Sequence, residues 1–196
     1  MNYQQYNRVY TGTDSLTQLM TGLKLCYDSV KVTLGGRGRN VTIHHYNHNQ
    51  LEQKYAIQNT KDGVTVIKSL YTTSPEMNIG IDLMKQTCDK TVKEVGDGTT
   101  NTVILTYNIL DKVIEQLNNN NNANVYKIKK GMDYATQEVI DKLNYMKTNI
   151  TTKEELYNIA MISSNSDGNV SEIVSDIIDE FGVDCKITIK RSPTND

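Results

Sequence analysis

The stretch VGDGTTNTVIL at residues 95–105 decides the fold, because it ends one amphipathic helix and begins the next. Gly96 suits the left-handed backbone that closes a helix. At the start of the following helix, the first N–H groups have no intrahelical partner and the helix dipole is positive, so backbone donors there bind phosphate oxygens. Thr99 and Thr100 add hydroxyl donors. Asp97 offers a hard oxygen ligand for Mg²⁺ bridging the same phosphates, the alternative being that it only caps the helix.

Apolar residues at helical spacing predict a long helix on each side of this turn and another near the N-terminus. The helix before the turn starts at the cap signal Ser74-Pro75, and the first helix covers residues 14–32 behind a Thr13/Asp14 cap signal. The predicted apolar faces are Leu16, Leu19, Met20, Leu23, Cys26, Tyr27 and Val30 in the first helix, Ile81, Met84, Cys88, Val92 and Val95 in the second, and Val103, Tyr107, Leu110, Ile114 and Leu117 in the third.

The rest of the chain adds more helices and a few short strands. The asparagine run 118–122 predicts a solvated loop, followed by a fourth helix with Ile128, Ala135, Val139, Leu143 and Met146 on one face. Together these elements predict a mainly α fold, a packed helical bundle with a small β-hairpin appendage. The remaining predicted elements are helices at about 152–162 and 167–181, and strands within NVTIHH (40–45), KYAIQNTKDGVTVIKSL (54–70) and KITIK (186–190).

Two further glycine turns precede the central one. The loop VTLGGRGRN spans residues 32–40, and the tetrapeptide TKDG spans residues 60–63. Alone, a glycine loop of this kind is more often a simple turn than a phosphate cradle, and Lys-Asp-Gly is an ordinary turn tripeptide. Because these two turns and VGDGTTNTVIL occur in this order and with these separations, the three together favour a phosphate site more strongly than any one of them alone.

The chain resembles the group I (GroEL-type) chaperonins in five segments that occur in family order. DSVKVTLGGRGRNVTI is similar to the first helix, phosphate loop and following strand of the family. TKDGVTV is similar to the start of its next strand, and VGDGTTNTVIL to its Mg²⁺ and phosphate helix start. KKGMDYA and ISSNSD resemble a later equatorial helix and the beginning of the intermediate domain.

The resemblance implies an ATP and Mg²⁺ site. Residues 1–145 would form the N-terminal half of an equatorial ATP-binding domain and residues 146–196 part of an α/β intermediate (hinge) domain, with the apical domain absent. Asp62 would lie near the γ-phosphate and act in hydrolysis, and Asp97 would also bind the metal. The implied nucleotide contacts are Thr33, Leu34, Gly35, Gly36, Lys61, Gly96, Asp97, Gly98, Thr99, Thr100 and Asn101.

Several positions depart from the family pattern. Gly36 stands where the family usually has Pro, which loosens the turn. Arg37 replaces a common Lys and keeps its charge, and Asn101 replaces a usual Thr. The hairpin at residues 40–60 is longer than usual, and in the family this hairpin touches the neighbouring subunit, so ring formation could be altered.

The resemblance also implies that the site is completed from outside these 196 residues. The return segments of the family carry the Asp that positions the attacking water, so this chain alone is expected to be a weak or inactive ATPase. A homo-oligomer or a complementary chaperonin polypeptide is the expected partner, with no contacts to unfolded protein or to a co-chaperonin. The alternative function is a chaperonin-derived, non-catalytic structural or assembly component of a larger complex such as a viral one.

Composition excludes several other classes of protein. A net charge of -2 argues against a nucleic-acid binder, including one that uses Arg37 and Arg39, and no apolar run is long enough to span a membrane. The N-terminus has no secretory signal, so a cytoplasmic location is expected. The scattered Cys26, Cys88 and Cys185 predict small buried residues. The cluster His44, His45 and His48 does not favour a metal site, because adjacent histidines on a strand point to opposite faces and the residues that follow look like a polar loop.

Overall fold

The computed structural model describes residues 11–45, 56–120, 123–164 and 166–188, which form two compact units. The first unit covers Met1–Lys129 and the second Lys130–Asp196, so the division falls inside helix α5 (Val125–Met146). The boundary predicted from the sequence lies later in the chain, between residues 145 and 146. The assignment of the two domains as equatorial and intermediate stays a prediction. None of the described helices is long and apolar enough to cross a membrane.

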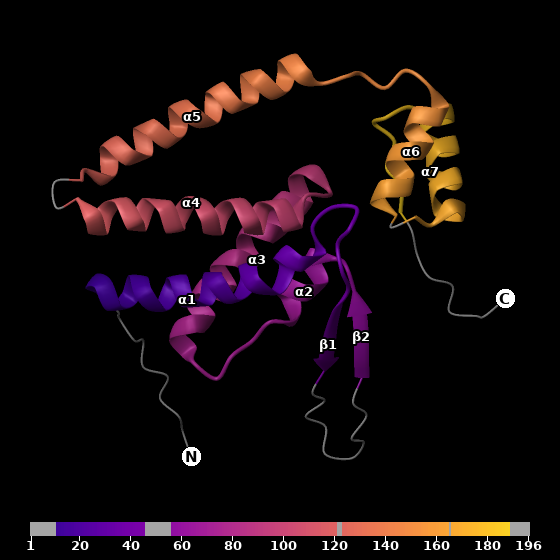
Figure 1. Ribbon diagram of the computed structural model, residues 1–196. Coiled ribbons are helices and arrows are strands. Elements are labelled where there is room, and N and C mark those ends of the chain that lie inside the picture. Colours follow the sequence, from indigo (N-terminus) through magenta and orange to yellow (C-terminus); the bar gives the residue numbers. More distant parts are fainter. Residues whose placement is uncertain (1–10, 46–55, 121–122, 165, 189–196) are drawn as a thin grey trace. The chain divides into compact units, whose positions relative to one another are not determined.

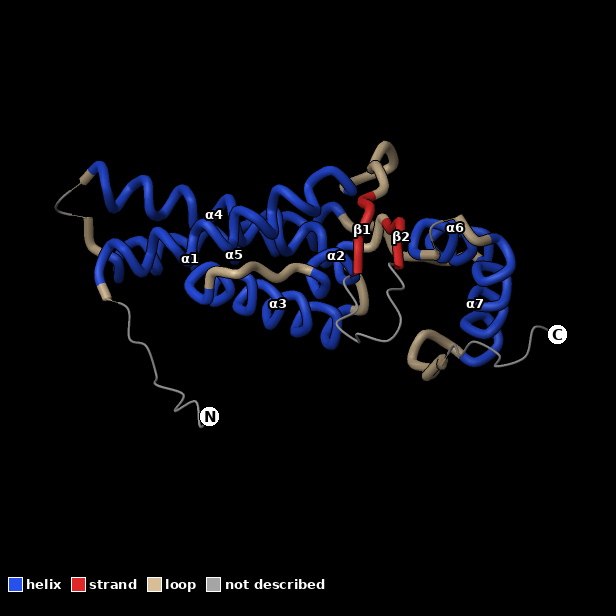
Figure 2. Tube along the Cα trace, turned by 90° about the horizontal axis from the view of Figure 1, so that it is seen from below, coloured by secondary structure: helices blue, strands red, loops and turns tan. Residues whose placement is uncertain are grey.

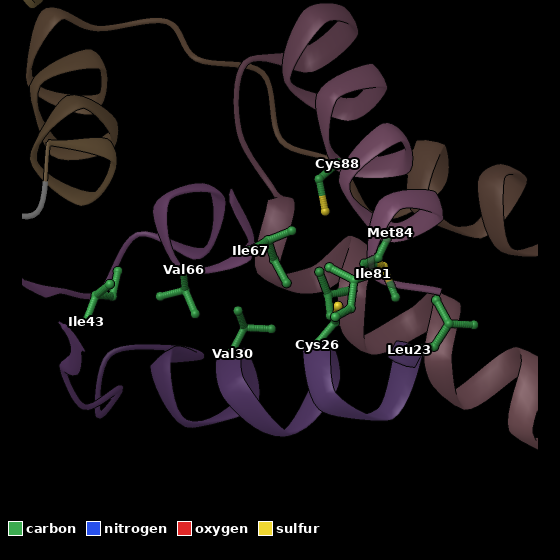
Figure 3. Close-up of a cluster of buried hydrophobic side chains, with 10 residues drawn as sticks. Leu23, Cys26, Val30, Ile43, Val66, Ile67, Ile81, Met84 and Cys88 are labelled. Atoms are coloured by element: carbon green, nitrogen blue, oxygen red, sulfur yellow. The ribbon is translucent and has the colours of Figure 1, made fainter. Parts of the chain in front are cut away.

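The first unit is a helical bundle built around three long helices (Figure 1). Helix α1 (Gly12–Val30) packs against α3 (Pro75–Val95) and α4 (Thr99–Asn119), and short helix α2 (Gly63–Ser69) contacts all three. The prediction of a mainly α fold is thereby confirmed. The core that holds the bundle together consists of Leu23, Cys26, Val30, Ile43, Val66, Ile67, Ile81, Met84, Cys88 and Val103, most of which are labelled in Figure 3.

The ends of the long helices follow the predicted cap signals closely. The Ser74 hydroxyl accepts from the Met77 N–H at 3.3 Å, Pro75 occupies the first turn of α3, and Gly96 closes that helix with φ +83°. Helix α1 differs slightly, because it begins at Gly12, ahead of the predicted Thr13/Asp14 signal, and runs into the 3-10 turn η1 (Lys31–Thr33). Helix α4 extends into the asparagine run as far as Asn119.

The segment after TKDG is a helix, so the prediction of a strand there was wrong. Asp62 is the N-cap of α2, with its carboxylate accepting from the N–H groups of Val64 and Thr65. The buried residues of α2 are Gly63, Val66 and Ile67, which have helical spacing i, i+3, i+4. The β-branched residues suggested a strand, but burial of this face against the three long helices decides the conformation.

A two-stranded antiparallel sheet forms the appendage of the first unit. Strand β1 (Val41–His45) pairs with β2 (Ala56–Thr60) in the register that places Val41 opposite Thr60. Ile43 is buried, and β1 contacts α2, which ties the hairpin to the bundle. The predicted strand at 40–45 is confirmed, whereas the tip of the hairpin with His48 lies outside the described residues.

The second unit contains the helix pair α6 (Lys153–Ser163) and α7 (Gly168–Phe181), which pack against each other. Both helices match their predicted ranges, and Figure 2 shows the helical character of this part of the chain. Helix α5, predicted from its apolar stripe, has no buried residue. Residues 186–188 form no strand, contrary to the prediction for KITIK, whose last two residues lie outside the described part.

Candidate functional site

The three glycine-containing motifs meet at the start of α4. The hydroxyl oxygens of Thr33 and Thr100 lie 3.4 Å apart, although 67 positions separate them in the sequence. A Cβ added at Gly63 would lie 2.5 Å from the Thr100 hydroxyl oxygen. Because η1 and α2 both contact α4, the glycine loop and the TKDG turn adjoin the first turn of that helix. The sequence placed these motifs in one site, and the fold brings them together.

The first glycine loop is held by an internal hydrogen bond, and the backbone at its turn is exposed. The Gly38 N–H donates to the Gly35 carbonyl at 2.9 Å, and a Cβ at Gly38 would meet the Thr33 carbonyl oxygen at 2.1 Å. Gly35 has φ +74°, which favours glycine. A Cβ at Gly35 or Gly36 would meet no atom within 4 Å, and Leu34 beside them is exposed. The loop therefore presents accessible backbone at its turn.

The GDGTT segment leaves the start of α4 without a side-chain cap. The N-cap is Gly98, with φ +89°, and the first intrahelical bond runs from the Thr102 N–H to the Gly98 carbonyl at 2.9 Å. Asp97 does not cap the helix, because its carboxylate accepts from the Gly98 N–H at 2.6 Å. Among the described residues no side chain accepts from the N–H groups of Thr99 to Asn101. These groups therefore have no side-chain acceptor, although Thr99 itself is buried, and a helix start of this kind suits an anion.

Asp97 is exposed, and its second carboxylate oxygen accepts no hydrogen bond from another described residue. Within the described part of the chain, no group of three His, Cys, Asp or Glu residues is arranged to hold a metal ion. Asp97 would thus be a single protein ligand. Such a site suits Mg²⁺, which keeps several waters and is commonly bound through one or two carboxylates together with substrate phosphates.

Asp62 has a structural role that we did not predict from the sequence, as the N-cap of α2. Its two carboxylate oxygens accept from the Val64 N–H at 3.2 Å and the Thr65 N–H at 3.0 Å, and the Thr65 hydroxyl also donates to it. The neighbouring Lys61 is exposed and has no hydrogen bond or ion pair with another described residue. The signal for the cap was the Asp itself, which precedes a segment with buried residues at helical spacing.

A groove of about 440 Å³ lies elsewhere in the first unit, between α1 and α4. It contains none of the predicted site residues. Tyr107 on its wall stacks on Tyr27, with ring centroids 4.6 Å apart. The groove is lined by Leu16, Thr17, Met20, Thr21, Lys24, Tyr107, Asp111, Ile114 and Asn118.

Residues 27–188 match the TCP-1/cpn60 chaperonin family, and the chain belongs to this family. Among solved structures, it is similar to the chaperonin gp146 from bacteriophage EL 2 (Pseudomonas aeruginosa), crystallised in the presence of ATP-BeFx. Crystal form II matches with a TM-score of 0.67 and 26% identity over 88% of this chain, and crystal form I with a TM-score of 0.66 and 25% identity over 88%. Each match covers 29% of the gp146 chain. The mainly helical fold with its small antiparallel sheet is similar to a chaperonin equatorial domain.

Proposed function

We propose that the chain is an ATP-binding part of a chaperonin that supports ATP-dependent protein folding. The observation that carries this proposal is the meeting of three separate motifs at the uncapped start of α4, where Thr33 and Gly63 both adjoin Thr100. An uncapped helix start beside an open glycine loop is suited to binding phosphates. Membership of the chaperonin family and the likeness to a chaperonin crystallised with ATP-BeFx support the same function.

The residues present fit a magnesium nucleotide. The open backbone at Gly35 and Gly36 leaves room for phosphates, and Lys61 and Arg37 supply exposed positive charge. Asp97 would hold Mg²⁺, which when bound neutralises charge on the phosphates. The proposed set of contacts is that given by the sequence, namely Thr33, Leu34, Gly35, Gly36, Lys61 and residues 96–101.

For hydrolysis we propose that Asp62 acts near the γ-phosphate while it caps α2. An ionised carboxylate has lone pairs for more than the hydrogen bonds that Asp62 already accepts, so both roles are compatible. We further propose that efficient turnover needs residues beyond this chain, since it corresponds to 29% of gp146. The order of the motifs supports a group I chaperonin, with residues 1–145 equatorial and 146–196 intermediate.

We propose that a second copy or a complementary chaperonin polypeptide covers α5. One face of this helix carries Met132, Val139, Leu143 and Met146, none of which is buried within the second unit. A long helix gains most of its stability from burying such a face. Native mass spectrometry with and without Mg²⁺ and ATP would report the stoichiometry, and a strictly monomeric chain in both conditions would count against this partner.

Removal of the Asp97 carboxylate tests the nucleotide site. We expect Asp97→Ala to abolish Mg²⁺-dependent ATP binding in calorimetric titrations of the full chain. The matched control is Asp133→Ala, which removes an exposed carboxylate on α5 and should leave the affinity unchanged. Equal affinity for Mg·ATP in the wild type and Asp97→Ala would contradict the proposed metal site. Failure of the wild type to bind Mg·ATP would favour a structural role for the chain.

A further inference from the structure

The side chain of Thr100 lies between the two motifs that adjoin α4. Its hydroxyl oxygen is 3.4 Å from that of Thr33 on one side and would be 2.5 Å from a Cβ at Gly63 on the other. Thr33 is 8% exposed and Gly63 is buried, so both neighbours belong to packed parts of the unit. The half-buried Thr100 hydroxyl therefore has packed protein groups on two sides.

The direction of the hydrogen bond follows from the other contact of Thr33. The Thr33 hydroxyl donates to the Val30 carbonyl at 2.8 Å. Because a hydroxyl carries one hydrogen, the Thr33 oxygen can only accept from Thr100. At 3.4 Å this is a long hydrogen bond. In this contact Thr100 is the donor and Thr33 the acceptor.

The contact with Gly63 is fixed by the anchoring of α2. Val66 is 1% exposed and Ile67 is not exposed at all, so this short helix is held in the core. At its other end, the Lys85 ammonium donates to the Leu70 carbonyl at 2.9 Å. Because α2 is anchored through its buried middle and its C-terminal end, and Gly63 is itself buried, movement of Gly63 away from Thr100 would disturb the core.

We propose that Thr100 is a positioning residue of the nucleotide site. Its hydroxyl holds the glycine loop through Thr33, and its side chain supports the first turn of α2 at Gly63. This inference rests on the proposed nucleotide binding and deepens it. Thr100 then offers phosphate its backbone N–H, while its hydroxyl, which the sequence assigned to phosphate, acts through Thr33.

A double-mutant cycle with Mg·ATP tests whether Thr100 acts through Thr33. We expect Thr100→Val to bind about three- to tenfold more weakly, as the loss of one hydrogen bond allows, and Thr100→Ser to bind within about twofold of the wild type. Adding Thr100→Val to Thr33→Val should cause no further loss. The same fold loss in both backgrounds would make Thr100 an independent phosphate ligand and overturn the proposal.

A second double-mutant cycle, measured without nucleotide, tests the contact between Gly63 and Thr100. Gly63→Ala should lower the urea midpoint of the full chain, because its Cβ meets the Thr100 hydroxyl oxygen. Adding Thr100→Ala removes that atom and should restore part of the loss. If Gly63→Ala does not fold, a folded double variant gives the same support, and an unfolded double variant contradicts the contact.

The two experiments separate failure of this inference from failure of the proposed function. A wild-type chain that does not bind Mg·ATP would overturn the proposed function and the positioning role with it. Intact Mg·ATP binding together with additive urea shifts for Gly63→Ala and Thr100→Ala would overturn the positioning role alone.

Discussion

Gly22 on α1 and Gly80 on α3 face each other so closely that a Cβ added at either would lie 3.2 Å from the Cα of the other. A Cβ at Gly22 would also lie 2.1 Å from the Met77 carbonyl oxygen, and one at Gly80 would lie 2.2 Å from the Leu19 carbonyl oxygen. The atoms in the way belong to the backbone, so a side-chain rotation cannot relieve the contact. The two glycines set how closely the helices of the core pack.

We expect Gly22→Ala to lower the free energy of unfolding by about 1–3 kcal/mol, because the added methyl group overpacks this crossing. An ordinary helical glycine gives the opposite sign, since alanine is favoured there by about 0.5–1 kcal/mol. Gly131→Ala on α5 is the matched control, because a Cβ there meets no atom within 4 Å. Urea unfolding followed by circular dichroism measures both. Stabilisation by Gly22→Ala would contradict the close crossing.

Asp62 gives a prediction about stability that is separate from nucleotide binding. We expect Asp62→Ala to lower the free energy of unfolding by about 1 kcal/mol, because the N–H groups of Val64 and Thr65 lose their acceptor. Asp62→Asn should stay close to the wild type, since asparagine caps helices about as well as aspartate. Thermal unfolding without nucleotide compares the two variants. Equal losses for alanine and asparagine would show that the cap is not what stabilises α2.

The sequence predicted the long helices correctly because their local signals agree with their burial. Ser74-Pro75 and Gly96 mark ends that the structure confirms, and the residues between them bury one face. In α2 the local and tertiary signals conflict. Its β-branched residues favoured a strand, but Val66 and Ile67 are buried against neighbouring helices, which no local pattern reveals.

The sequence predicted which motifs form the candidate site, but it did not predict the contacts between their side chains. The sequence indicated that the loop at Thr33 and the turn at Gly63 belong with the start of α4. It did not show that Thr100 is turned toward both, because the orientation of one hydroxyl depends on the distance between segments that are far apart in the chain. The Gly22 and Gly80 crossing was missed for the same reason.

Glu155 gives a prediction for acid conditions. Its carboxylate accepts from the Thr151 N–H at 2.8 Å and the Thr152 N–H at 3.0 Å, and these bonds lower the pKa of Glu155. Because the folded pKa lies below the unfolded value, the stabilising effect is full above the unfolded pKa and is lost as the pH falls through the folded pKa. Acid should therefore weaken the start of α6.

Glu155→Gln tests this sign. The amide of glutamine keeps an oxygen that accepts from both N–H groups, so the stability of the α6 and α7 pair should depend less on pH below about pH 5 than in the wild type. Hydrogen exchange of the amides in α6 measures the local effect. Glu154→Gln is the control, since Glu154 is exposed on the same turn. Identical acid profiles for the wild type and Glu155→Gln would contradict the capping role.

The buried cysteines give a prediction for alkaline conditions. Burial raises the pKa of Cys26 from 9.0 to about 12, with a further contribution from Cys88, and raises the pKa of Cys88 from 9.0 to about 11. The unfolded chain loses these protons at lower pH than the folded chain does. The stability they contribute is therefore full below the unfolded pKa of 9.0 and is lost as the pH rises through the folded values.

We expect the urea midpoint of the wild type to fall between about pH 9 and about pH 11, and to fall less steeply in Cys26→Ala, which lacks one of the two buried thiols. The alanine variant starts from a lower midpoint because it leaves a cavity beside Met84 and Ile81 in the core. The slope with pH, and not the starting value, is the quantity that tests the thiol. Cys185→Ala removes a thiol that is only partly buried and should keep the wild-type slope. A Cys26→Ala slope equal to that of the wild type would show that proton release by this thiol does not contribute to alkaline unfolding.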